Sequence, residues 1–426
     1  MPQIIKNMKS TLKTIFFLFI AIFLYSCSDD ETTDQTDTTD PYVIEGNITE
    51  NKTLTAGNIW TLNGRVSVTD GATLTIEAGT VIKAMSGTGS DASTLIIARG
   101  GKIDAQGTAS SPIVMTSVSD NILADGSYPS SGPALGVGTR GLWGGLLVLG
   151  KAPSSFKNDV SELQIEGIPA SDINGLYGGT DAADNSGTIN YLSIRHGGAE
   201  IGEGNEINGL TLGGVGSGTT ISNVEVIANV DDGIEFFGGT VNASNLLVWG
   251  QGDDGIDIDQ AYAGTITNAM VILTEASDHA FEIDGPEGSA PGKYTIDGAT
   301  IIGTNDDCSP TGVDGEMADF RKGATGANKN VYVLNFTEGK DVELDASADA
   351  ATYTAGDLTF MNWDIQYPLA DDDTVCTGET VNKIFDCKSD ESTFETDAST
   401  FAEIVTAKKS DAGADESAFS WTFYKR

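Results

Sequence analysis

Basic residues, histidine and clustered cysteine are scarce in this 426-residue sequence. It has 23 Lys and Arg against 62 Asp and Glu, which gives a formal net charge of −39. A charge of that sign argues against nucleic acid and anionic lipid as partners and favours cations as counter-ions. With two histidines (His196 and His279) and no clustered thiols, the sequence also fits a transition-metal site poorly.

Helical patterns are missing between the apolar stretches, which are short and alternate with polar residues. Residues 66–84 (VSVTDGATLTIEAGTVIKA) and 93–118 indicate strands separated by Gly-containing turns. Because no helical pattern of about 10–15 residues lies between the strands, βαβ units are excluded. The sequence has no P-loop, dinucleotide-binding fingerprint or nucleophile elbow, which excludes the enzyme classes that depend on them.

A repeated pattern of acidic and apolar residues occupies residues 229–284. Its three copies are NVDDGIEFF (229–237), QGDDGIDID (251–259) and SDHAFEID (277–284). Repeats of about 22 and 25 residues, each with one short strand, are typical of a β-solenoid. Alternation predicts two columns of inward apolar residues: Ile234, Ile256 and Phe281, and Phe236, Ile258 and Ile283.

These patterns predict an all-β fold, a right-handed parallel β-helix over residues 43–305. Residues 306–426 are expected to form terminal coils and an irregular C-terminal cap, because the exposed end of a solenoid must be covered. Within this part, residues 400–408 are the best candidate for a short helix. Residues 119–141 and 154–180 break the strand pattern and are predicted as long loops.

Asparagines recur at equivalent places in successive coils. Asn223, Asn245 and Asn268 each precede an apolar strand segment. We therefore expect a column of stacked Asn side chains that hydrogen-bond along the solenoid.

The N-terminus predicts export. Lys6, Lys9 and Lys13 precede an apolar run over residues 15–25 that is too short to span a bilayer, so residues 1–26 are expected to be a signal peptide. The run ends in Leu-Tyr-Ser-Cys, which resembles the lipobox of bacterial lipoproteins and implies lipidation of Cys27. The following Ser-Asp-Asp-Glu resembles the export signal of Bacteroidota lipoproteins, which implies an outer-membrane location facing the cell exterior. Residues 27–42, acidic and Thr-rich, are predicted to be a disordered tether.

Three further cysteines lie in the C-terminal part of the chain. An oxidising compartment permits one disulfide, and proximity in the sequence favours Cys376 with Cys387. Cys308 is left without an assigned partner.

Acidic residues alternate with the inward columns and are expected on the outer surface of one sheet. Glu235, Asp257 and Glu282 form one predicted column, and Asp259 and Asp284 belong to the next. Successive coils lie about 4.8 Å apart, so ionised carboxylates there repel by about 1 kcal/mol even in water. Such a stack predicts a site for Ca²⁺, a hard ion that binds oxygen ligands. Solvated carboxylates without an ion remain the alternative.

The whole pattern is similar to the pectin-lyase-like β-helix lipoproteins of Bacteroidota. The similarity rests on residues 92–114 (ASTLIIARGGKIDAQGTASSPIV), residues 140–153 (RGLWGGLLVLGKAP) and the Asp-Asp-Gly-Ile repeats. It covers most of residues 45–425 and implies the fold, but no settled activity.

The repeats also resemble, in outline, the active-site coils of polygalacturonases. That resemblance implies Asp254 as general acid, Asp232 and Asp253 as the base that activates water, and His279 as the group that tunes them. Arg321 or Lys322 would hold a substrate carboxylate. The sequence departs from the polygalacturonase pattern because His279 lacks flanking glycines, the basic pair is shifted, and an extra Asp follows Asn229-Val230.

A polysaccharide lyase is another enzymatic possibility. Its base would be Lys, Arg, His or Tyr, and the pair Arg195 and His196 precedes the acidic repeats. A lone Arg-His pair at the end of a strand is more often structural. For either enzyme, we expect the acidic face to lie in a cleft bordered by residues 119–141 and 154–180.

The resulting prediction is a surface-exposed outer-membrane lipoprotein with an acidic, Ca²⁺-binding β-helix face that binds or adheres to a glycan or cell-surface ligand. It would contact the membrane only through its lipid anchor. The alternative is a polysaccharide-degrading enzyme, an inverting hydrolase or a uronate lyase, that acts at the same face.

Overall fold

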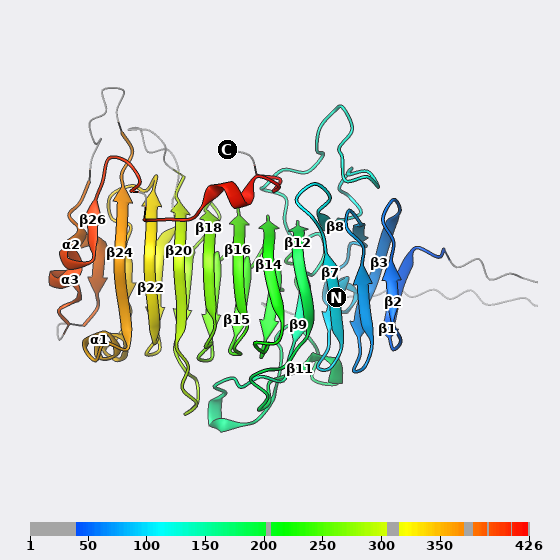
Figure 1. The fold of residues 1–426 in the computed structure, drawn as a ribbon, viewed down its shortest axis with the longest axis horizontal. Coiled ribbons are helices and arrows are strands. Elements are labelled where there is room, and N and C mark those ends of the chain that lie inside the picture. The colour runs from blue at the N-terminus through cyan, green and yellow to red at the C-terminus, as the bar shows by residue number, and fades with distance from the viewer. Residues whose placement is uncertain are drawn as a thin grey trace, which may run out of the picture. The chain divides into compact units, whose positions relative to one another are not determined.

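The computed structural model describes residues 40–201, 206–304, 315–369, 378–389, 392–409 and 411–424. Twenty-four strands in these ranges stack in parallel as a right-handed β-helix, which confirms the predicted fold (Figure 1). The pairings form three ladders. In the part of the chain that the structure describes, no helix is long and apolar enough to cross a membrane.

Ladder 1 consists of the short strands that carry the acidic repeats. Its members are the C-terminal half of β3 (Ile59–Val68), β6 (Thr94–Ile97), β9 (Leu146–Leu149), β13 (Leu210–Gly213), β15 (Ile234–Phe237), β17 (Ile256–Asp259), β19 (His279–Asp284), β21 (Glu316–Arg321), β23 (Val342–Leu344) and β25 (Phe385–Cys387).

Ladders 2 and 3 share long strands that bend in the middle. These are β12 (Gly187–Arg195), β14 (Thr220–Ile227), β16 (Asn242–Trp249), β18 (Thr265–Ile272), β20 (Tyr294–Ile302), β22 (Gly326–Leu334) and β24 (Leu358–Gln366). Nearer the N-terminus, β2 (Lys52–Leu54), β4 (Thr73–Ile76) and β7 (Lys102–Gln106) belong to ladder 2, and β5 (Val81–Ala84) and β8 (Ile113–Ser117) to ladder 3. The strand β1 (Val43–Ile48) pairs along β3, and β26 (Ala402–Ile404) ends ladder 3.

The bend in most of the long strands is an asparagine with positive φ. Asn223, Asn245 and Asn268 have φ of 53°, 55° and 61°, a region that Asn tolerates better than most residues. Their side chains are hydrogen-bonded in series, with Asn245 Nδ2 donating to Asn223 Oδ1 at 3.0 Å and Asn268 Nδ2 donating to Asn245 Oδ1 at 2.7 Å. The predicted asparagine column is therefore confirmed.

The core lies inside the coil and is made of the predicted inward columns. Ile234, Ile256 and Phe281 pair in register and are at most 1% exposed. Burying each such side chain contributes about 1.5–3 kcal/mol, so repetition from coil to coil stabilises the helix strongly.

Residues 154–180 cover part of the outer surface of ladder 1. They contain the antiparallel pair β10 (Leu163–Gln164) and β11 (Leu176–Tyr177). Phe156 and Tyr177 pack on Leu147 and Leu149, which point outward from β9. This loop makes the outer surface of β9 part of a second apolar cluster.

The C-terminal end is closed by aromatic side chains and three short helices, α1 (Ser347–Thr354), α2 (Val381–Ile384) and α3 (Phe394–Asp397). The helix predicted at residues 400–408 is wrong, because β26 occupies this segment and pairs with β24. Backbone pairing at an open sheet edge outweighs the weak helix preference of so short a segment.

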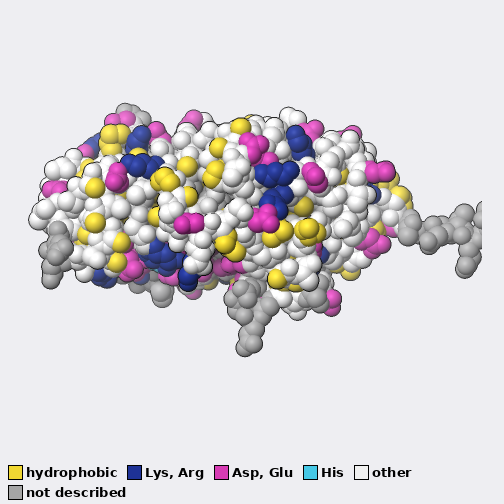
Figure 2. All heavy atoms as spheres, turned by 90° about the horizontal axis from the view of Figure 1, so that it is seen from below, with side chains coloured by type: hydrophobic (Ala, Val, Ile, Leu, Met, Phe, Trp, Pro, Cys, Tyr) yellow, Lys and Arg dark blue, Asp and Glu magenta, His cyan; other side chains and the backbone are white. Residues whose placement is uncertain are grey.

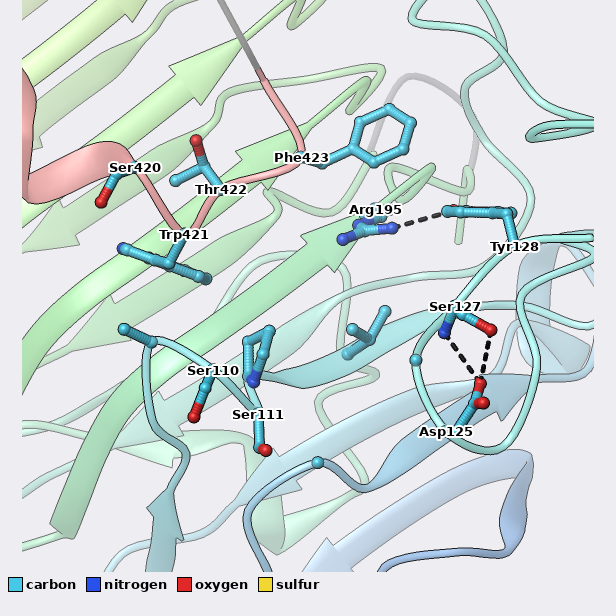
Figure 3. Close-up of a pocket in the computed structure, with 15 residues that line it drawn as sticks. Ser110, Ser111, Asp125, Ser127, Tyr128, Arg195, Ser420, Trp421, Thr422 and Phe423 are labelled. Atoms are coloured by element: carbon cyan, nitrogen blue, oxygen red, sulfur yellow. Dashed lines mark hydrogen bonds between the residues drawn. The ribbon is translucent and has the colours of Figure 1, made fainter.

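After β26 the chain turns back along the outer face of ladder 3 (Figure 1, red). We call residues 411–424 the C-terminal strap. Backbone N–H groups of the strap donate hydrogen bonds to residues of successive long strands, from β22 to β14. The acceptors are Asn330, Thr300, Asn268 and Glu225. Near its end, Phe423 lies over the guanidinium of Arg195 (Figure 3).

Charge is not spread evenly over the molecule. On the face shown in Figure 2, Lys and Arg side chains are interspersed with Asp and Glu, although the net charge of the chain is −39. Acidic side chains gather instead on the outer surface of ladder 1.

Candidate functional site

One outward column of ladder 1 carries a carboxylate in six successive coils. Its members are paired in register: Glu235, Asp257, Glu282, Asp319, Glu343 and Asp386. The three predicted members are confirmed as neighbours. Sequence reasoning missed the last three because the Asp-Asp-Gly-Ile motif is absent there, although alternation with inward Phe320, Leu344 and Phe385 marks them as outward positions.

The first coils of this column hold a buried cluster of three carboxylates, from Asp232, Glu235 and Asp257. Each residue is at most 8% exposed, and one oxygen of each lies within 4.8 Å of the others. Asn208 Nδ2 donates to Glu235, and the backbone N–H of Asp254 donates to Asp232 Oδ1 at 2.9 Å. Among the described residues, nothing hydrogen-bonds to Asp257 Oδ1.

Without a bound cation, the three carboxyls of this cluster are not all ionised at neutral pH. Burial raises the pKa of all three carboxyls well above their ordinary values, and repulsion among neighbouring acids raises them further. A buried, unpartnered carboxylate oxygen is costly unless it accepts a proton or contacts a cation. Three carboxylates with an unpartnered oxygen suit a hard divalent ion such as Ca²⁺.

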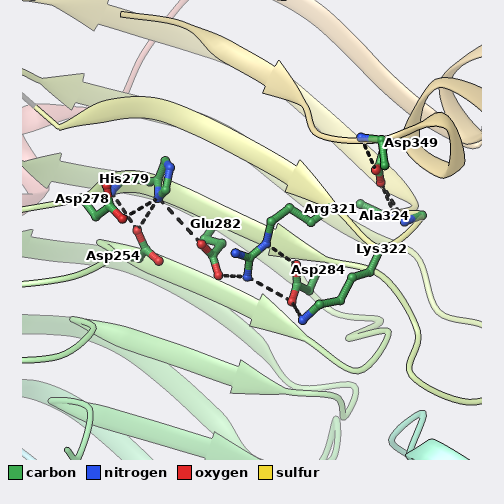
Figure 4. Close-up of polar contacts among 11 residues, drawn as sticks. Asp254, Asp278, His279, Glu282, Asp284, Arg321, Lys322, Ala324 and Asp349 are labelled. Atoms are coloured by element: carbon green, nitrogen blue, oxygen red, sulfur yellow. Dashed lines mark hydrogen bonds and ion pairs between the residues drawn. The ribbon is translucent and has the colours of Figure 1, made fainter. Parts of the chain in front are cut away.

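A second acidic group lies beside the starts of β17 and β19 and includes two of the predicted catalytic residues, Asp254 and His279 (Figure 4). Asp254 Oδ1 accepts from the backbone N–H of His279 at 2.7 Å and lies 2.9 Å from His279 Nδ1. Burial lowers the pKa of His279, but the hydrogen bond and charge of Asp254, with Asp278 and Glu282, outweigh it and raise the pKa to about 9. The imidazole is therefore a cation at neutral pH.

Two more carboxyls at this edge titrate near neutrality. Burial, with the charges of Glu166 and Asp253, raises the pKa of Asp231 to about 7. Burial, with the charge of Asp254, raises the pKa of Asp253 to about 6. A carboxyl with a pKa in this range can exchange protons at physiological pH.

The predicted substrate-binding cations Arg321 and Lys322 lie beside the acidic column, but they are already paired. Arg321 Nε donates to Asp284 Oδ1 at 2.8 Å, its Nη2 contacts Glu282, and Lys322 Nζ contacts Asp284. Burial raises the pKa of Asp284, but these two cations outweigh burial and hold it below its usual value. A substrate carboxylate would have to compete with these ion pairs.

The structure therefore brings most of the predicted site together. Asp232, Asp253, Asp254 and His279 gather at one edge of ladder 1, and the five predicted metal ligands (Glu235, Asp257, Asp259, Glu282 and Asp284) lie on its outer surface. Burial, with the charge of Asp284, raises the pKa of Asp259 to about 7.

Other predicted residues lie elsewhere. Arg195 ends β12 in ladder 3, and His196 Nδ1 lies 2.7 Å from the carbonyl oxygen of Thr139. Cys27, Cys308 and Cys376 fall outside the described residues, so lipidation and the disulfide stay predictions. Cys387 is buried in β25.

Both long loops approach the acidic face. In residues 154–180, Ser155 accepts from the backbone of Gly288, and Asp159 Oδ1 accepts from the backbone of Ser289 at 2.6 Å. In residues 119–141, Arg140 donates to the carbonyl of Gly250 at 2.7 Å and to Thr274 Oγ1 at 2.9 Å. Each loop is thus tied to a turn that flanks the strands of ladder 1.

Comparison with known proteins agrees with this architecture. The family model of the pectate-lyase like beta helix domain matches residues 46–423, and the chain belongs to that family. No curated protein and no solved structure matches the chain significantly.

Proposed function

We propose that this member of the pectate-lyase-like β-helix family is a polysaccharide-binding protein whose acidic face holds Ca²⁺. Its fold fits a polysaccharide-binding or polysaccharide-degrading role. The observation that carries the cation is the cluster of Asp232, Glu235 and Asp257, with its unpartnered buried oxygen on Asp257.

The geometry of the cluster supports this ion. Oxygens that bind one Ca²⁺ at about 2.3–2.6 Å lie up to about 5 Å from each other, and these three lie within 4.8 Å. The ion would be held by Asp232, Glu235 and Asp257 and would neutralise two of their three charges. Remaining carboxylates of the column would then accept hydrogen bonds from sugar hydroxyls.

Degradation of the same polysaccharide is the second candidate. It is favoured by the carboxyl of Asp253, whose pKa of about 6 suits proton transfer near neutral pH. In this scheme Asp254 is the acid, Asp232 and Asp253 share the base role, and His279 tunes them. The enzyme scheme needs Arg321 or Lys322 to hold a substrate carboxylate. Because Arg321 is already paired with Asp284, binding is favoured over catalysis.

The cell location is also part of the proposal. Lipidation at Cys27 would anchor the protein in the outer membrane, and the Ser-Asp-Asp-Glu that follows would direct it to the outer surface. Two or more acyl chains on one residue hold a protein stably on a membrane.

Calorimetry with Ca²⁺ tests the cation. We expect saturable binding to the wild type and loss of that binding in Asp257→Asn. Asp104→Asn is the matched control, because it removes the same charge from β7 of ladder 2, outside the clustered acids, where Asp104 Oδ1 accepts from Gln106 Nε2 at 2.7 Å. Absent binding to the wild type, or unchanged binding to Asp257→Asn, would refute the cation site.

Assays on a panel of acidic glycans separate binding from degradation. Binding with no release of reducing ends or unsaturated uronates supports a binding protein. Release that disappears in Asp254→Asn would establish the enzyme instead. A chain that neither binds nor cleaves any glycan would contradict both.

A further inference from the structure

A pocket lies on ladder 3, between the C-terminal strap and residues 119–141 (Figure 3). Its volume is about 570 Å³, within the range of pockets that hold small molecules. Val114 of β8 and Arg195 of β12 belong to its lining, together with Tyr128 of the loop and Trp421 of the strap. The pocket is thus assembled from β8 and the loop that follows it, together with two segments that are distant in sequence, β12 and the strap.

Arg195 is a buried cation in this pocket with donors to spare. It is 6% exposed. Nε donates to Ser193 Oγ at 2.8 Å and Nη1 donates to Tyr128 Oη at 2.8 Å. Nη2 lies 3.9 Å from Glu225 Oε2, too far for a hydrogen bond. A guanidinium has five N–H groups, so these contacts leave donors for an anion.

The acid nearest to Arg195 is occupied by other partners. Glu225 Oε2 accepts from Ser193 Oγ at 2.6 Å, and Oε1 accepts from the backbone N–H of Tyr424 at 3.1 Å. Tyr128 Oη also donates to Asp120 Oδ2 at 3.1 Å, which holds the phenol in place. These bonds orient the guanidinium, which forms an ion pair with Glu225 but keeps N–H groups on Nη1 and Nη2 that donate no hydrogen bond to these residues.

Aromatic rings and hydroxyl groups complete the walls. Trp421 packs edge to face on Tyr191 at 5.4 Å, so its ring is held in place. Ser110, Ser111 and Ser127 supply hydroxyls. The rim carboxylate of Asp125 accepts two hydrogen bonds from Ser127 and is solvent-exposed, so its field is screened. Aromatic faces with nearby polar groups suit a ring that is apolar on one side and polar at its edge.

We propose that this pocket binds one sugar ring that bears a single acidic group, a carboxylate or a sulfate. The acidic group would accept hydrogen bonds from Arg195, and the ring would lie against Trp421. The site lies on ladder 3 and needs neither the acidic column of ladder 1 nor its cation. It is therefore independent of the Ca²⁺ site.

Titration of the full chain with methyl glucuronide, glucose 6-sulfate and methyl glucoside, each with a chelator present, tests the proposal. We expect one or both acidic sugars to bind saturably, and the neutral sugar to bind about tenfold more weakly or worse, because charge-assisted hydrogen bonds are the stronger ones. Comparison of the two acidic sugars identifies the acidic group. Equal binding of all three, or binding of none, overturns the proposal.

Variants locate the binding. Trp421→Ala should weaken acidic-sugar binding about tenfold, and Trp421→Phe should restore most of it, since a phenyl ring keeps an aromatic face for the sugar. Arg195→Lys should weaken binding of the acidic sugar while leaving the neutral sugar unchanged, and a thermal melt verifies its folding. Asp257→Asn should bind like the wild type, so failure of the Ca²⁺ site and failure of this pocket are distinguishable. Unaltered binding by Trp421→Ala and Arg195→Lys would refute the location.

Discussion

Replacing Asp257 with Asn should have opposite effects on stability with and without Ca²⁺. Asp257 shares a buried space with Asp232 and Glu235, and their oxygens lie within 4.8 Å of one another. Two unit charges at about that distance repel by about 3 kcal/mol at an effective dielectric constant of about 20. Because the cluster stays partly protonated when it holds no cation, we expect Asp257→Asn to stabilise the protein by about 1–3 kcal/mol at pH 8 in chelator.

The pH dependence follows from the raised pKa values. The pKa of Glu282 is raised to about 8, that of Asp259 to about 7 and that of Asp253 to about 6, in each case with burial as the first cause. The folded chain therefore binds more protons than the unfolded chain above pH 4, so stability should fall as pH rises from about 4 to 8. The pKa of His279 is raised to about 9, so the stability that its protonated ring contributes is also lost as the pH rises toward 9. The raised pKa values of Asp232, Glu235 and Asp257 add to this loss, and Ca²⁺ should reverse their part of it, because a bound cation stabilises the ionised carboxylates.

Thermal unfolding of wild type, Asp257→Asn and the control Asp104→Asn at pH 5 and pH 8, in chelator and in Ca²⁺, checks these expectations. Ca²⁺ should raise the melting temperature of the wild type and of Asp104→Asn at pH 8 more than at pH 5. It should raise that of Asp257→Asn little at either pH. A melting temperature that rises with pH in chelator, or a full Ca²⁺ response in Asp257→Asn, would refute the electrostatic reasoning.

Three other outcomes are expected. Asn245→Ala should destabilise the protein by about 2–3 kcal/mol, because it breaks two side-chain hydrogen bonds and places Ala at φ 55°. Asn245→Gly should lose less stability, because Gly adopts this φ without strain. Equal denaturation midpoints for wild type and Asn245→Ala would contradict the asparagine column. Removal of residues 411–426 should expose the apolar outer face of ladder 3, including Met270 and Ile302, and so increase dye binding and aggregation; unchanged dye binding would show that the strap does not cover this face. Cys27→Ser should abolish incorporation of labelled fatty acid and release the protein from membranes, whereas labelling that persists would exclude Cys27 as the lipidation site.

Local rules predicted the repeating parts of this molecule correctly. Ile234, Ile256 and Phe281 were identifiable because alternation and coil spacing fix which side chains point inward. The same alternation marks Asp319 and Glu343, but the Asp-Asp-Gly-Ile motif that drew attention to the earlier coils is absent there. The helix predicted at residues 400–408 failed because pairing of Ala402 with Trp363 depends on a strand about 40 residues away in the sequence.

The sequence by itself determined the β-helix, its register and the columns of outward acids, because each coil contacts only its neighbours and the same interactions recur. Only the tertiary structure decided which acids are buried and what surrounds them. Asp232, Glu235 and Asp257 form a buried cluster because adjacent coils bring them together and Asn208 packs against them. Arg195 faces Tyr128 and Phe423 because a loop and the C-terminal strap meet over β12. Such contacts join segments without a common period, and periodicity in the sequence carries no information about them.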